Sequence, residues 1–131
     1  MCVFCETNGD LIVSESKNSL ILINCFPMGK MSLLAIPKRH VESLSELTAE
    51  ELNDFFQSIV LIENKVKAVL RPEGINIFIN EGEIAGQTVN HLHCHIVFRG
   101  KNDGLKNFMR KREKKIITPA KIKKIKNIFK L

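Results

Sequence analysis

The sequence lacks the two kinds of segment that would take a chain into or across a membrane. It has no apolar run of the length that a membrane span needs, and no secretory signal made of a basic stretch, an apolar stretch and a cleavage site. We therefore expect a cytoplasmic location and no membrane span. In that reducing compartment, metal binding or burial suits the four cysteines better than disulfide formation. They are Cys2, Cys5, Cys25 and Cys94.

Histidine is scarce, yet three of the four histidines fall within five residues: His91, His93 and His95. Side chains alternate between the two faces of a strand. A strand here would therefore place the three imidazoles on one face, with Leu92 and Cys94 on the other. Imidazole is the side chain best suited to nucleophilic, acid–base or metal-ligand chemistry near neutral pH. The histidine segment is therefore the candidate for function.

Negative charge is scarce at the end of the chain. Residues 1–100 carry 8 Lys and Arg against 12 Asp and Glu, whereas residues 101–131 carry 12 against 2. The net charge of +6 thus comes from the tail, which argues against a nucleic-acid-binding body. We find no repeat or low-complexity segment, and 131 residues are enough to bury one core. We expect a domain over 1–100 and a basic helical extension over 101–131.

The spacing of apolar residues predicts an α+β fold on an antiparallel sheet, because runs of strands flank one helix without alternating with it. Thr48 and Glu51 form a capping-box pattern at the start of that helix. Pro72 and Gly74 end it. The expected elements are strands at 11–13, 20–23, 33–36, 75–79 and through the histidines, with a helix over 48–70.

The basic tail allows three interpretations. Residues 104–115 are polar but helical in character, and Thr118 with Pro119 would open a second, amphipathic helix. This helix could pack through its isoleucine stripe, contact RNA or another anionic partner, or lie on a membrane surface. The tail contains only two aromatic residues, Phe108 and Phe129, so it offers no evident platform for stacking bases.

The histidine cluster itself has two functional interpretations, and an incidental cluster is the least expected. In the first, a central histidine is a nucleophile and its neighbour polarises the group under attack. In the second, two or three of the histidines bind a catalytic metal. The preceding loop, residues 80–88, offers glycines, backbone N–H groups, an amide and a hydroxyl, which suit an anionic phosphate. This loop favours phosphate chemistry at a histidine.

The residues from His91 to Val97, His-Leu-His-Cys-His-Ile-Val, match the His-φ-His-φ-His-φ-φ signature (φ apolar) of histidine-triad (HIT) nucleotide hydrolases and transferases. The sequence resembles this family, in its zinc-carrying bacterial-type branch, over about residues 1–100. The resemblance implies a five-stranded antiparallel sheet with one long helix, and a homodimer. Other segments in the family's order are Cys2-Val3-Phe4-Cys5, Asn24 with Phe26-Pro27, Ile36-Pro37-Lys38-Arg39-His40, and Asn80-Glu81-Gly82 with Ala85-Gly86-Gln87.

The resemblance also implies a nucleotidyl-histidine mechanism on purine nucleoside phosphoramidates or dinucleoside polyphosphates. His93 would attack the α-phosphorus and form a covalent phosphoramidate, which water or another phosphate then removes. His95 would hydrogen-bond the phosphate or leaving group, and Gln87 would orient a phosphoryl oxygen. The nucleotide-binding residues that it implies are Asn24, Asn80, Gln87, Thr88, His93 and His95.

The C-x2-C pair Cys2 and Cys5 is a weak motif alone. In zinc-carrying HIT proteins a similar pair is joined by two histidines, which correspond here to His40 and His91. A Cys2His2 set is closed and favours zinc, as in a structural site. The resemblance thus implies structural Zn²⁺ that holds the N-terminus beside the histidine segment.

The sequence departs from the family pattern at two places. Met31-Ser32 stands where many members have Gly-His, and Phe98-Arg99 stands where they often have Pro-Arg. Asn24 occupies a position near the nucleotide ribose that is Asp in one branch. Substrate preference therefore stays open. Two other functions also stay open: a metallohydrolase that uses the triad as ligands, and a non-catalytic nucleotide-binding or adaptor protein.

Overall fold

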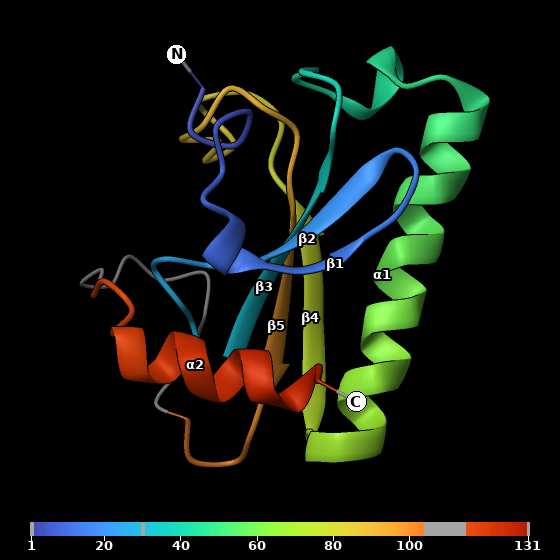
Figure 1. Cartoon of the computed structure of the whole chain (residues 1–131). Helices are drawn as coiled ribbons and strands as arrows, with labels where there is room; N and C mark the ends of the chain where they lie inside the picture. The colour runs from blue at the N-terminus through green and yellow to red at the C-terminus, as the bar shows by residue number, and fades with distance from the viewer. Residues whose placement is uncertain (1, 30, 104–114, 131) are drawn as a thin grey trace.

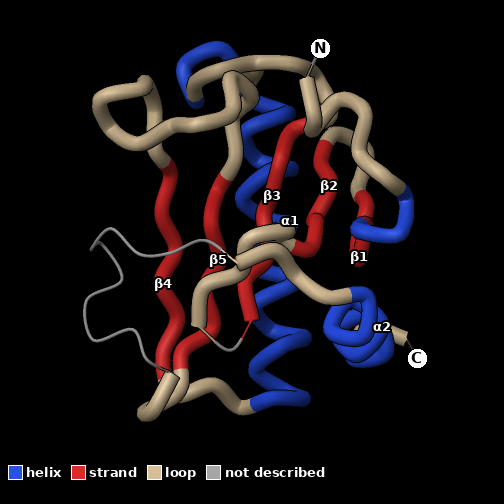
Figure 2. The backbone as a smooth tube through the Cα atoms, turned by 90° about the vertical axis from the view of Figure 1, so that its left-hand side faces the viewer, coloured by secondary structure: helices blue, strands red, loops and turns tan. Residues whose placement is uncertain are grey.

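The structure, a computed structural model, describes residues 2–29, 31–103 and 115–130. Its centre is a five-stranded antiparallel sheet in the order β1-β2-β3-β5-β4 (Figures 1 and 2). The elements are β1 (Ile12–Glu15), β2 (Ser19–Ile23), β3 (Met31–Pro37), α1 (Ala49–Leu70), β4 (Gly74–Ile79), β5 (Cys94–Arg99) and α2 (Pro119–Ile128), with 3-10 turns at Gly9–Leu11 and Leu44–Glu46. The expected α+β fold with one long helix is confirmed. The polar segment expected over 104–115 lies, apart from its last residue, outside the described residues.

The two faces of the sheet have different coverings. Helix α1 packs on one face and buries Phe55, Ile59 and Val66 against β-strand residues such as Leu33 and Ile96. The opposite face is open toward the viewer in Figure 2, where α1 lies behind the strands. A strand turns alternate side chains to opposite faces, so each central strand contributes to both. The open face is where the candidate site lies.

The local sequence explains where α1 begins and ends. The Thr48 hydroxyl accepts a hydrogen bond from the Glu51 N–H at 3.1 Å, and the Glu51 carboxylate accepts one from the Thr48 N–H at 3.0 Å. This capping box satisfies two backbone donors that the first turn would leave unpaired. At the other end Arg71 has a φ of 47°, and Pro72 prevents the helix from continuing.

The histidine segment differs from its prediction. Strand β5 begins at Cys94, so of the three histidines only His95 lies on it. The residues before it pair with the segment that follows β3: the Leu92 N–H donates to the Val41 carbonyl at 2.6 Å. Leu92 and Cys94 are nevertheless both buried in the core, as the alternation predicts. The three histidines therefore alternate with core residues as predicted, but they belong to an extended segment of which only the last part is a strand.

The basic C-terminal helix packs on the body. Thr118 caps α2 by accepting a hydrogen bond from the Lys121 N–H at 3.2 Å. Ile117 and Ile125 are buried members of the main core cluster, and the Ile117 N–H donates to the Cys25 carbonyl at 2.7 Å. The isoleucine stripe thus has the packing role that the first of the three interpretations gave it. No helix in the described ranges is both long and apolar enough to cross a membrane.

Candidate active site and metal site

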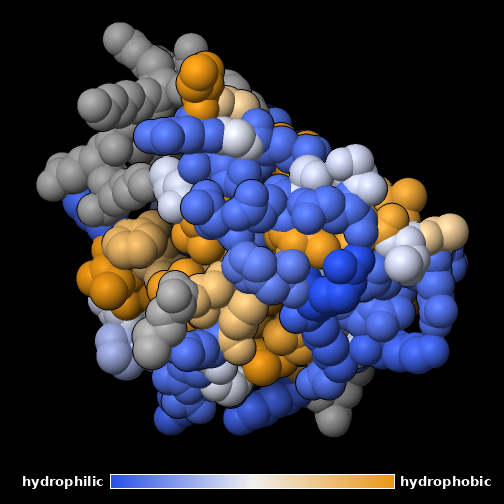
Figure 3. All heavy atoms as spheres, turned by 90° about the horizontal axis from the view of Figure 1, so that it is seen from above, coloured by the Kyte–Doolittle hydropathy of each residue, from blue (hydrophilic) through white to orange (hydrophobic). Residues whose placement is uncertain are grey.

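A cavity of about 360 Å³ lies on the open face of the sheet. Most of its lining is apolar, from the N-terminal segment, strand β2 and the β2–β3 loop. The space-filling view from above shows hydrophobic atoms on the left and through the centre of this surface (Figure 3), and the N-terminal segment lies on the left in Figure 1. His93 and His95 also line the cavity. An apolar hollow with a few converging polar groups is the usual form of a small-molecule site.

His93 is held in one tautomer. Its Nδ1 lies 2.8 Å from the backbone carbonyl oxygen of His91, and a carbonyl can only accept. Nδ1 therefore carries the proton and Nε2 carries the lone pair. Burial lowers the pKa of His93 from its ordinary value of 6.5, although the bond to the His91 carbonyl opposes this shift. His93 is thus neutral at pH 7 and can act as a nucleophile.

His95 lies directly beside His93. The two ring centroids are 5.0 Å apart, and the ring of His95 stacks on Phe78 at 4.5 Å with an interplanar angle of 9°. The register of the sheet brings Phe78 opposite His95. Phe4, from the N-terminal segment, meets His93 edge-on at 5.1 Å. The structure therefore brings the predicted catalytic pair together and packs an aromatic side chain against each of the two rings.

Asn24 and Thr88, two of the predicted nucleotide-binding residues, line the same cavity. Asn24 is buried, and its Oδ1 accepts a hydrogen bond from the Phe26 N–H at 2.9 Å. Since Oδ1 is already bonded, the Nδ2 group is the part of this amide that suits a ligand oxygen. Thr88 is exposed, and its hydroxyl is available at the edge of the cavity.

Gln87 and Asn80 are not among the residues that line the cavity. Gln87 braces the preceding loop: its Oε1 accepts from the Gly82 N–H at 2.8 Å, and its Nε2 donates to the Glu42 carbonyl at 3.2 Å. The Asn80 amide packs against Gly86, where an added Cβ would lie 3.2 Å from Nδ2. A direct role for either side chain at the phosphate stays a prediction.

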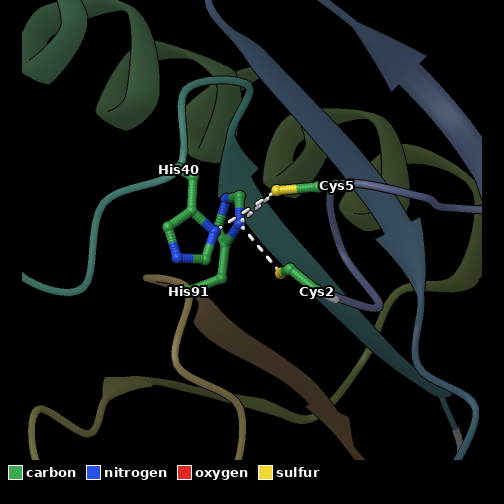
Figure 4. A group of neighbouring side chains, drawn as sticks. All are labelled: Cys2, Cys5, His40 and His91. Atoms are coloured by element: carbon green, nitrogen blue, oxygen red, sulfur yellow. Dashed lines mark hydrogen bonds between the residues drawn. The ribbon is translucent and has the colours of Figure 1, made fainter.

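A separate cluster is formed by Cys2, Cys5, His40 and His91. It adjoins His93 through the backbone carbonyl of His91. Each offers one ligand atom, and these atoms all lie within 4.8 Å of one another. The four side chains point toward a common centre (Figure 4). The Sγ of Cys5 is 3.3 Å from Nδ1 of His40, and the Sγ of Cys2 is 3.4 Å from Nδ1 of His91. The structure thus brings together all four predicted metal ligands.

The geometry of this cluster fits zinc. Tetrahedral bonds of about 2.0–2.3 Å separate neighbouring donor atoms by about 3.3–3.8 Å. Three Sγ–Nδ1 distances in the cluster, 3.3, 3.4 and 3.5 Å, fall in this range. The buried Nε2 of His91 lies 2.8 Å from the Pro37 carbonyl oxygen, so it carries the proton. Nδ1 of His91 then keeps its lone pair toward the thiols. A backbone carbonyl that orients a ligating histidine in this way is typical of metal sites.

Two residues at the departures from the family pattern, Ser32 and Arg99, have structural roles. The buried Ser32 hydroxyl bonds both the N–H and the carbonyl of Met28 at 2.6 Å and so closes the β2–β3 loop. Arg99 lies at the far end of β5 from His95, and its guanidinium pairs with Asp103 at 2.6 Å. The contacts of this guanidinium, with Asp103 and Asn76, thus lie toward the end of β5 away from His95.

Sequence reasoning missed the aromatic braces Phe4 and Phe78. Phe4 lies inside the Cys2-to-Cys5 motif, so its closeness to the histidines follows once the cluster is assigned. Phe78 shares one face of β4 with Asn76, and the alternation of residues 75–79 indicates this face. The register that sets Phe78 against His95 depends on strand pairing and could not be read from the sequence.

Known proteins resemble the chain along most of its length. A model of the HIT domain matches residues 6–102. An asymmetrical bis(5'-nucleosyl)-tetraphosphatase of Schizosaccharomyces pombe is 36% identical over 99 residues, which cover 76% of this chain and 54% of that protein. The adenosine 5'-monophosphoramidase hnt1 of the same yeast is 35% identical over 100 residues, which cover 73% of this chain and 72% of that protein.

The likeness extends to three dimensions. The crystal structure of a Zn-bound histidine triad family protein from Mycobacterium smegmatis superposes with a TM-score of 0.75. It is 27% identical and covers 98% of this chain and 92% of its own. The HIT model spans well over half of the chain, and the histidine segment, the sheet and the long helix all agree with it. The chain belongs to the HIT family.

Proposed function

We propose that this protein is a nucleotide hydrolase or transferase that acts on the α-phosphate of purine nucleoside phosphoramidates or dinucleoside polyphosphates. The observation that carries the proposal is the His93 tautomer, because it leaves a neutral Nε2 as nucleophile in a cavity of nucleotide size. The phosphoramidase and tetraphosphatase relatives support both substrate classes.

The reaction has two displacements at phosphorus. The Nε2 lone pair of His93 forms a bond to the α-phosphorus, and the leaving amine or phosphate departs with the electron pair of the bond that breaks. An amine takes up a proton as it leaves, and the proton that the attacking water later gives up restores the balance. The imidazolium that results keeps its Nδ1 proton, which stays hydrogen-bonded to the His91 carbonyl. His95 hydrogen-bonds the phosphate or the leaving group. Water or a second phosphate then attacks phosphorus, the P–N bond breaks, and Nε2 regains its lone pair.

The metallohydrolase alternative is less well supported by the geometry. His91 turns its Nδ1 toward Cys2 and Cys5, away from a common centre with the other two histidines. Within the described ranges, the metal-compatible group contains His40 and His91 but neither His93 nor His95. This division favours a catalytic pair and a structural anchor over a three-histidine metal centre.

The same proposal includes structural zinc held by Cys2, Cys5, His40 and His91. Bound there, zinc would supply folding free energy by tying the N-terminal segment to the rest of the fold. That segment carries Phe4, which lines the cavity and contacts His93. Metal binding also requires both thiols reduced, which is consistent with a cytoplasmic location. The zinc-bound relative supports this assignment.

We also propose a homodimer that forms through α1 and β4. Leu52, Phe56 and Val60 form a stripe on α1, here called the outer stripe, and all three are exposed. Strand β4 is an edge of the sheet, and its Ile77 is 44% exposed on the face that α1 partly covers. A large apolar surface beside an unpaired strand edge is typical of an interface between subunits.

The direct test is turnover. Purified protein would be incubated with adenosine 5'-phosphoramidate and with diadenosine tetraphosphate, and the release of AMP would be followed by chromatography. The proposal expects AMP from at least one substrate, with no loss when EDTA is present during a short assay. Tight nucleotide binding without any product would favour the non-catalytic alternative, and rapid loss of activity with EDTA in a protein that stays folded would favour a catalytic metal.

A further inference from the structure

A second hollow, of about 560 Å³, adjoins the nucleotide cavity. The two share Asn8, Leu11 and Cys25 in their linings, so they meet along a common wall. Neither His93 nor His95 lines this outer hollow. A group that reaches it must therefore extend from a bound nucleotide on a side away from the reacting phosphate.

Three cations of the C-terminal segment line the outer hollow: Lys123, Lys126 and Lys130. Asp10 is the one carboxylate in that lining. In the part of the chain that the structure describes, none of the three lysines forms an ion pair. Ammonium groups gathered around a concave surface, with little opposing charge, attract anions.

The segment that carries the lysines is anchored to the body of the protein. The Ile117 N–H donates to the Cys25 carbonyl at 2.7 Å, which fixes the start of α2 to a residue shared by the two hollows. Buried Ile117 and Ile125 anchor the segment in the main core. The charges of α2 are therefore positioned relative to the nucleotide cavity.

The chemistry of a nucleotide limits what can reach these lysines. Its base is uncharged at neutral pH, and its 5'-phosphate is the group that His93 attacks. The further phosphates of a dinucleoside polyphosphate continue from the phosphorus beside His93, and neither His93 nor His95 lines the outer hollow. A ribose hydroxyl is the remaining point from which an anionic group can extend toward the lysines. We propose, on the basis of the proposed function, that the outer hollow binds a phosphate on the 2' or 3' oxygen of the nucleotide. The preferred substrates would then be nucleotides phosphorylated on the ribose or the 5'-terminal nucleotide of a short oligonucleotide.

Binding measured without turnover tests this inference. Isothermal titration would compare AMP, adenosine 3',5'-bisphosphate and 5'-phosphorylated ApA on the whole protein. We expect the wild type to bind the bisphosphate roughly tenfold more tightly than AMP, as two or three exposed charge pairs would supply. The triple variant Lys123→Ala, Lys126→Ala, Lys130→Ala should lose this preference and keep its affinity for AMP.

The matched control is Lys121→Ala with Lys124→Ala, because these two lysines of the same helix line a different hollow beside Leu70 and Phe98. This variant should keep the preference. If the dinucleotide also binds more tightly than AMP, the site is assigned to oligonucleotide ends. If only the bisphosphate binds more tightly than AMP, the site is assigned to mononucleotides. Equal affinity of the wild type for AMP and the bisphosphate, or a preference that survives in the triple variant, would overturn the inference. These affinities are measured without hydrolysis. Failure of this inference is therefore distinguishable from failure of the hydrolase proposal, which the release of AMP tests.

Discussion

The Nδ1 atom of His93 donates to the backbone carbonyl of His91 over 2.8 Å, so the candidate nucleophile is held by the residue that completes the metal cluster. His91 is itself fixed on both sides, by the Pro37 carbonyl at Nε2 and by the Cys2 thiol near Nδ1. The candidate metal cluster and the candidate nucleophile thus meet at residues 91 and 93, because the carbonyl that orients His93 belongs to a member of the cluster.

Replacing both thiols of the cluster should remove the metal and loosen the N-terminal segment. For Cys2→Ser with Cys5→Ser we expect loss of the single equivalent of zinc and a Tm lower by roughly 5 °C or more, since a structural metal contributes folding free energy. Zinc would be measured by atomic emission and Tm by calorimetry. Cys25→Ser, outside the cluster, is the control. A double variant that retains a full equivalent of zinc would contradict the assignment.

Activity should persist below the pH at which an ordinary histidine is half protonated. Burial lowers the pKa of His93 below 6.5, and only the form with a free Nε2 can attack phosphorus. The acidic limb of kcat/KM should therefore have its midpoint below pH 6.5. The zinc content would be followed over the same range, to separate loss of metal from protonation. A midpoint above pH 6.5 would contradict the burial argument.

The same shift predicts how stability depends on pH. The unfolded chain protonates this histidine near pH 6.5, whereas the folded chain does so only at lower pH. Unfolding therefore takes up a proton in that window, and stability falls as the pH falls through it. His93→Asn removes the group, so its Tm should fall less than that of the wild type between pH 7.5 and 5.5. Equal losses would count against a buried neutral His93.

The stacking of Phe78 on His95 should affect chemistry more than binding. Phe78→Leu keeps an apolar side chain but removes the flat ring 4.5 Å from His95. We expect kcat to fall roughly three- to tenfold, in line with the energy of an aromatic pair, with little change in the affinity for AMP. Phe78→Tyr keeps the ring and should keep kcat. An unchanged kcat in the leucine variant would remove any positioning role for Phe78.

The proposed dimer should dissociate when charge is placed on the outer stripe. Phe56→Glu with Val60→Glu puts two carboxylates on exposed apolar positions of α1, where a partner subunit would have to desolvate them. Sedimentation should change from dimer to monomer. Lys65→Glu, an exposed position of the same helix outside this stripe, should remain dimeric. A wild-type protein that sediments as a monomer would refute the dimer outright.

Much of this fold could be predicted because its signals are local. The Thr48 and Glu51 capping box, the apolar runs of the first three strands and the Thr118–Pro119 start of α2 each depend on neighbouring residues. The four predicted metal ligands also lie together, as the family resemblance implied, although they span residues 2–91.

The parts that were not predicted depend on contacts between distant segments. The histidine segment leaves strand geometry because Leu92 and His91 bond Val41 and Pro37, some fifty residues earlier. Phe78 stacks on His95 because the register of β4 and β5 sets the two residues opposite each other. Such contacts exist only once the fold has formed, so no pattern of neighbouring residues in the sequence predicts them.

The most direct test of the central claim is detection of the covalent intermediate on His93. Wild-type protein would be mixed with adenosine 5'-phosphoramidate, denatured within milliseconds at alkaline pH, and analysed by intact-mass and peptide mass spectrometry. His93→Asn is the matched variant, because its amide nitrogen can still donate to the His91 carbonyl while the Nε2 nucleophile is gone. The account predicts one adenylyl group per subunit on His93 of the wild type, and neither adduct nor turnover in the folded variant. Turnover by His93→Asn at the wild-type rate would contradict it.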